Sequence, residues 1–113
     1  MNTKDLFPID RFQIVNETDD KEVECVYCAD LLSWAMGRAP AGCAWCTVMG
    51  NVNAVAVASL ADVSILILCE GAVFDDTAVE RAKQQDIFLV KTDLPAFEAA
   101  VIIGKKIDLP VFH

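Results

Sequence analysis

Four of the five cysteines in this 113-residue chain form two Cys-x-x-Cys pairs, a spacing that can bind a metal ion. The four residues are Cys25, Cys28, Cys43 and Cys46. Thiolates at this spacing hold zinc or an iron–sulfur cluster when their sulfurs converge on one point, and such pairs can also carry redox chemistry. The backbone around each pair decides whether the sulfurs converge.

The residues inside each pair favour strands over tight turns. Val26-Tyr27 lie inside the first pair and Ala44-Trp45 inside the second, and branched and aromatic side chains prefer strands. Residues three apart on a strand point to opposite faces, so the two sulfurs of each pair should diverge. We therefore expect four core cysteines and no cofactor, with a metal-binding or redox protein as the alternative. If the two strands are neighbours, one sulfur from each strand could still meet.

Other catalytic groups are sparse. The sole histidine, His113, is the last residue, and a frayed chain end is a poor support for a catalytic base. The five glycines form no phosphate-binding motif. The sequence therefore predicts a protein that is not an enzyme.

Composition narrows the class of protein further. The formal charge of -8 disfavours nucleic acid as a partner, because phosphate binding requires an excess of Lys and Arg. No secretory signal opens the chain, and the most apolar run, residues 63–69, is too short to span a membrane. An odd number of cysteines argues against a disulfide framework. We expect one cytoplasmic domain over residues 1–113, with no membrane partner.

Apolar segments of strand length alternate with segments of helical spacing. The expected strands cover residues 12–15, 23–28, 43–49, 63–69 and 87–92. The expected helices start at Leu31, cover 52–60, include Val79 and Ala82, and cover 96–105. This order predicts an α/β fold, a single small domain with a mostly parallel central sheet and helices packed on it.

The first and last helices carry more detailed expectations. Asp30 is placed to cap the helix that starts at Leu31. In the last helix, Phe97, Ala100, Val101 and Gly104 are expected to point inward. That helix is apolar on more faces than one small domain can cover, which predicts self-association.

Residues 22–106 resemble the DRTGG domain family, which is related to the N-terminal domain of HPr kinase/phosphorylase. The most specific matches are Asp30–Ser33, Asn53 with Val55–Ser59, Glu70-Gly71, and Thr92 with Ala96–Glu98. The motif that names the family is absent, and the loop after the third strand is Met49–Asn51. The resemblance implies an α/β domain like the HPr kinase N-terminal domain, which acts as a regulatory, dimer-forming element.

Fold and resemblance together imply a ligand crevice at the carboxyl ends of the parallel strands. The candidate ligand-binding residues are Asp30, Ser33, Asn51, Asn53, Thr92 and Glu98. For Asp30 the alternative is a helix cap, and for Glu98 a charge in the first turn of a helix. The predicted function is a non-catalytic regulatory or protein-interaction module. Its expected partners are a second copy of the chain, a partner protein or a small-molecule ligand.

Overall fold

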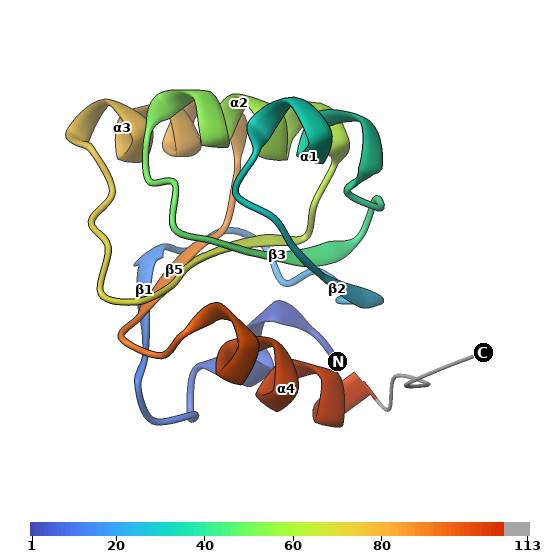
Figure 1. The fold of residues 1–113 in the computed structure, drawn as a ribbon. Coiled ribbons are helices and arrows are strands. Elements are labelled where there is room, and N and C mark those ends of the chain that lie inside the picture. Colours follow the sequence, from blue (N-terminus) through green and yellow to red (C-terminus); the bar gives the residue numbers. More distant parts are fainter. Residues whose placement is uncertain (108–113) are drawn as a thin grey trace.

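A five-stranded sheet forms the middle layer of the molecule (Figure 1). The computed structural model describes residues 1–107, so His113 lies outside the described residues. The strands are β1 (Phe12–Asn16), β2 (Cys25–Cys28), β3 (Cys43–Thr47), β4 (Ile65–Leu68) and β5 (Leu89–Thr92). The helices are the 3-10 turn η1 (Thr3–Leu6), α1 (Leu32–Arg38), α2 (Val52–Ala61), α3 (Asp76–Gln85) and α4 (Ala96–Ile107).

The strand order is β1-β5-β4-β3-β2, with β2 to β5 parallel and β1 antiparallel to β5. Each parallel strand therefore pairs with the next one along the chain. The connecting helices α1, α2 and α3 all lie on one face, as crossovers of a single hand require, and α4 covers the other face (Figure 1). The predicted α/β fold with a mostly parallel sheet is confirmed.

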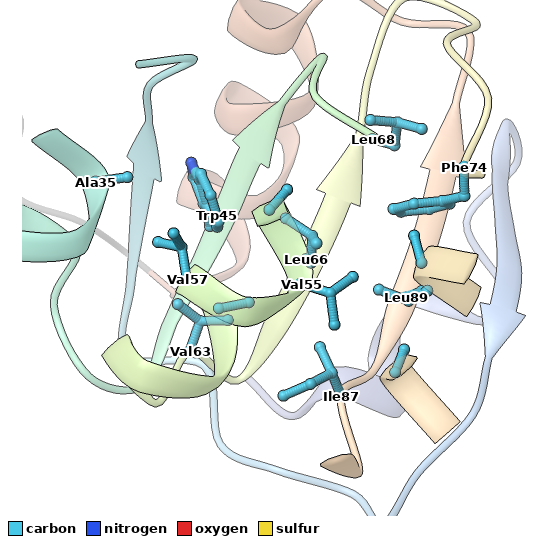
Figure 2. Packing of buried hydrophobic residues seen from close by; sticks show 14 of the residues in the cluster. Ala35, Trp45, Val55, Val57, Val63, Leu66, Leu68, Phe74, Ile87 and Leu89 are labelled. Carbon is cyan, nitrogen blue, oxygen red and sulfur yellow. The ribbon is translucent and has the colours of Figure 1, made fainter. Parts of the chain in front are cut away.

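Two layers of apolar side chains hold these elements together. Strands β3 and β4 are buried along their whole length, because helices cover both faces of the sheet. Trp45, Val55 and Leu66 pack between the sheet and helices α1 to α3 (Figure 2). Ile67 and Ile103 belong to the second layer, on the side of α4. None of the helices within residues 1–107 has the length and apolarity needed to cross a membrane.

The buried face of α4 differs from the prediction. Ala99 and Ile103 are buried, whereas Phe97 is 76% exposed and Val101 is 37% exposed. Residues four apart share one face of a helix, so burying Ala99 and Ile103 turns Phe97 and Val101 outward. The small side chain of Ala99 lets the helix approach the sheet closely, which the apolar pattern alone does not reveal. Ala100 is half-buried and packs on the core, in keeping with the prediction.

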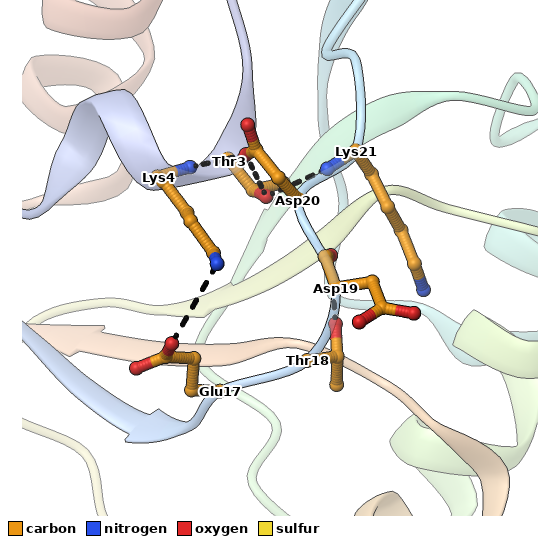
Figure 3. A network of polar contacts seen from close by, with 7 residues as sticks. All are labelled: Thr3, Lys4, Glu17, Thr18, Asp19, Asp20 and Lys21. Carbon is orange, nitrogen blue, oxygen red and sulfur yellow. Dashed lines mark hydrogen bonds and ion pairs between the residues drawn. The ribbon is translucent and has the colours of Figure 1, made fainter.

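A polar network fixes the segment before β1 against the loop that follows β1 (Figure 3). The Thr3 hydroxyl donates to Asp20 Oδ1 (3.1 Å), and the Lys4 amide donates to the same oxygen (2.9 Å). The Lys21 amide donates to Thr3 Oγ1 (3.0 Å). The hydrogen bond from the Lys4 amide lowers the pKa of Asp20 below its usual value. This network holds η1 beside the chain that enters β2.

Candidate functional site

Asp30 joins the ends of two strands and does not cap a helix. Helix α1 has Leu31 at its N-cap position and no capping side chain, so the predicted cap is wrong. The Thr47 hydroxyl (2.9 Å) and the Val48 amide (3.0 Å) both donate to Asp30 Oδ1. Thr47 Oγ1 in turn accepts a hydrogen bond from the Met49 amide (3.2 Å). Asp30 therefore fixes the loop after β2 to the end of β3.

We expect the Asp30→Ala variant to lose about 1–2 kcal/mol of unfolding free energy, because the buried Thr47 hydroxyl and the Val48 amide lose their shared acceptor. Urea denaturation followed by circular dichroism measures the change. Asp19→Ala is the matched control, since Asp19 is exposed, and its loss should stay within about 0.5 kcal/mol. Equal losses in the two variants would show that the Asp30 contacts are not structural.

Three other predicted site residues lie at helix N-termini above β2 and β3. Asn51 Oδ1 accepts a hydrogen bond from the Ala54 amide (2.9 Å), which makes Asn51 the N-cap of α2. Ser33 and Asn53 are exposed in the first turns of α1 and α2. The structure thus places these three residues at the carboxyl ends of β2 and β3, where Asp30 also lies.

Thr92 and Glu98 lie near the other edge of the sheet, beyond β4. Thr92 is buried, and its hydroxyl oxygen accepts a hydrogen bond from the Leu94 amide (3.2 Å). Thr92 also lines a depression of about 430 Å³, together with Gln13 and Lys91. Glu98 is exposed in the first turn of α4 and lines a second hollow of about 360 Å³. The six predicted residues therefore fall into two groups on either side of β4.

Arg11 lines both hollows and is a residue that the sequence did not single out. Its guanidinium forms two hydrogen bonds with the Asp93 carboxylate, of 2.9 and 3.0 Å. The hydrogen bonding raises the pKa of Arg11 and lowers that of Asp93. The antiparallel pairing of Phe12 with Thr92 brings this distant pair together, and no local motif reveals it. With Lys91 and Gln13, Arg11 offers N–H donors suited to an anionic group.

The two Cys-x-x-Cys pairs are split between the two faces of the sheet, as predicted. Cys43 belongs to the core beside α1 to α3 with Cys25 packed against it, and Cys46 lies in the core beside α4. In the parallel register Cys25 is aligned with Cys43 and Cys28 with Cys46. The two strands are neighbours, so each cysteine of β2 lies beside a cysteine of β3 in the ladder. Among residues 1–107, no group of three or more His, Cys, Asp or Glu side chains could hold a metal ion.

Among the four aligned thiols, the pKa of Cys28 is lowered and the pKa values of the other three are raised. A hydrogen bond with Cys46 lowers the pKa of Cys28 to about 7, although partial burial and the charge of Asp30 oppose the shift. The pKa of Cys46 itself is raised, first by its hydrogen bonds with Cys28 and Cys69. Burial raises the pKa of Cys43 to about 12 and also raises that of Cys25. The expectation of four core cysteines is wrong for Cys28, which is exposed because it ends the edge strand β2. Cys28 is also the thiol of the four that ionises most readily.

Comparison with known proteins adds no relative to this picture. No protein-family model matches the chain, and no curated protein is similar enough to count as a match. The resemblance to the DRTGG family therefore stays a prediction. The surfaces and side chains of the fold itself have to indicate what the protein does.

Proposed function

We propose that this protein is a non-catalytic, cytoplasmic regulatory module that self-associates through the outward face of α4. The observation that supports the proposal best is that Phe97 is 76% exposed to solvent. A large aromatic side chain is seldom left exposed without a binding role when other apolar groups surround it. The regulatory role follows the resemblance to DRTGG domains, which are dimer-forming elements.

Phe97 does not stand alone on this face. It borders the hollow of about 360 Å³ together with Val101, Ile102 and Leu94. Both Val101 and Phe97 point away from the sheet, because the opposite side of α4 is buried through Ala99 and Ile103. The result is an aromatic side chain beside an apolar hollow, which is the arrangement of an anchor and its pocket.

A second copy of the chain is the partner that suits this face best. The same hollow carries a positive group, Arg11, and a negative group, Glu98. In a two-fold symmetric dimer each residue of a patch meets another residue of the same patch, so Arg11 of one copy can approach Glu98 of the other. A patch with apolar groups and both charges is therefore complementary to itself.

We expect the Phe97→Glu variant to weaken the dimer at least about thirtyfold, because the change removes the anchor and places a charge beside Glu98. Sedimentation velocity over a concentration series up to about 50 µM, in the range where a micromolar dimer dissociates, measures the effect. The wild type should sediment as a dimer at the upper end. Circular dichroism confirms that the variant stays folded.

Leu60→Glu is the matched control, because Leu60 is 72% exposed but lies on α2, across the sheet from α4. This variant should dimerise like the wild type. A wild type that is monomeric at every concentration contradicts the proposal. So does a dimer that Leu60→Glu dissociates and Phe97→Glu leaves intact, since the interface would then lie on the opposite layer.

A further inference from the structure

We propose that Cys28 and Cys46 form a reversible disulfide between β2 and β3, with Cys28 as the thiol that reacts first with a low-molecular-weight disulfide. This redox site is independent of the proposed self-association. It also differs from a Cys-x-x-Cys site, because its two members come from different pairs of the sequence. The geometry of the sheet carries the inference.

The register places the two residues at bridging distance. Cys28 and Cys46 are direct partners in the parallel ladder between β2 and β3. Neighbouring strands lie about 4.8 Å apart, and a disulfide needs Cα atoms about 4.4–6.8 Å apart. Aligned residues on neighbouring strands point to the same face of the sheet. The alignment therefore meets the Cα–Cα requirement for a disulfide.

Cys69 contacts the same pair but is not aligned with it. The residue aligned with Cys46 on β4 is Ile67, so Cys69 lies two positions further along the chain. A displacement of two residues adds about 6.6 Å along the strand, which puts the Cα atoms beyond the reach of a bridge. The Cys69 thiol also donates to the Ile67 carbonyl oxygen (3.7 Å). Cys69 packs beside the pair as a buried neighbour of Cys46.

Exposure and acidity make Cys28 the first of the two thiols to react. Cys28 is exposed, whereas Cys46 is 1% exposed, so a solute reaches Cys28 first. The lowered pKa of Cys28 makes a large share of its thiol ionised near pH 7. Cys25 and Cys43 have the same alignment on the same two strands, but burial raises both of their pKa values. They form an internal control for the effect of alignment alone.

The disulfide forms in two successive thiol–disulfide exchange steps. The Cys28 thiolate attacks one sulfur of the small disulfide, which forms a mixed disulfide and releases a small thiolate. That thiolate takes the proton of Cys46, whose sulfur then attacks Cys28 Sγ and expels the second small thiolate. Two electrons pass from the protein thiols to the small disulfide. The reverse exchange with excess small thiol restores both cysteines.

The disulfide would link the edge strand β2 covalently to β3. Strand β2 is the last strand in the order and hydrogen-bonds within the sheet to β3 alone. Cys28 is its final residue, and Asp30 and helix α1 follow directly. Oxidation therefore fixes the point at which the chain leaves the sheet for α1.

Glutathione disulfide is the probe for the test, with the full-length reduced protein as the substrate. After quenching with N-ethylmaleimide, wild type should show an intramolecular loss of about 2 Da, which peptide mapping assigns to Cys28 and Cys46. Cys25→Ser should behave in the same way. Cys46→Ala should stop at the mixed disulfide on Cys28, and Cys28→Ser should stay reduced at the pair.

A second measurement separates reactivity from structure. The rate of Cys28 alkylation by iodoacetamide should reach half its maximum near pH 7 in wild type and at or above the ordinary value of 9 in Cys46→Ala, where partial burial and the Asp30 charge remain. At pH 7 the rate should fall at least about fivefold, since the lost thiolate outweighs the gain in intrinsic nucleophilicity. A link between Cys25 and Cys43, a wild type that stops at the mixed disulfide or stays reduced, or a wild-type half-point near pH 9 would overturn the proposal.

Discussion

Replacing Trp45 by alanine should lower the free energy of unfolding by about 4 kcal/mol, one of the two largest effects expected in this chain. Trp45 is fully buried at the centre of β3, among the side chains of the layer beneath α1 to α3 (Figure 2). Its indole N–H also donates to the Ala29 carbonyl oxygen (2.9 Å). The loss approaches the whole stability of a small domain, so the variant should be partly unfolded at ambient temperature.

Two further variants separate the causes of this loss. Trp45→Phe keeps most of the buried apolar area but removes the N–H donor, so we expect a loss of about 1–2 kcal/mol. Trp34→Ala is the matched control, because Trp34 is 54% exposed and its ring contacts the Arg38 guanidinium at 3.9 Å. Its loss should stay below about 1 kcal/mol. Urea unfolding followed by circular dichroism compares the three, and similar losses at both tryptophans would refute the burial argument.

The Gly50→Ala variant is expected to lose about 2–3 kcal/mol, the second large effect. A Cβ atom at Gly50 would overlap the Val73 carbonyl oxygen and would lie 3.1 Å from the Phe74 Cα. Both of these are backbone atoms, so no side chain can rotate away to make room. The Asp75 amide also donates to the Gly50 carbonyl oxygen (2.9 Å), which holds the two loops together.

Gly37→Ala is the control for the Gly50 prediction. Gly37 lies in α1, and a Cβ there meets no atom within 4 Å. Alanine favours a helix over glycine, so this variant should be unchanged or up to about 1 kcal/mol more stable. Thermal unfolding of the two variants beside wild type gives the comparison. A Gly50→Ala protein as stable as wild type would mean that the loop at Val73 moves freely.

The fold could be predicted because its signals are local. Each buried strand is a short apolar run, as in Ile65–Leu68, and each connecting helix has its own spacing. The divergence of the Cys-x-x-Cys pairs followed from strand geometry alone. The sequence does not reveal which strands are neighbours, so the alignment of Cys28 with Cys46 is only a conditional expectation.

The site was less predictable because its contacts join distant segments. Asp30 could be recognised as a polar residue near a helix start, but its partner Thr47 depends on β2 and β3 being neighbours. The bidentate pair of Arg11 with Asp93 depends on β1 pairing with β5. The inward side of α4 differs from the prediction because the small Ala99 packs on the sheet, which leaves the larger Phe97 exposed.

The order of the strands affects how the sheet assembles while the chain is being synthesised on the ribosome. Strands β2, β3 and β4 each pair with the next strand to be synthesised, so that part of the sheet can grow as the chain emerges. Strand β1 is made first, yet its partner β5 ends at Thr92. Strand β1 therefore stays unpaired until β5 has been synthesised. We expect β1 to join the sheet last, because closing that long loop carries the largest entropic cost of any strand pairing in the fold.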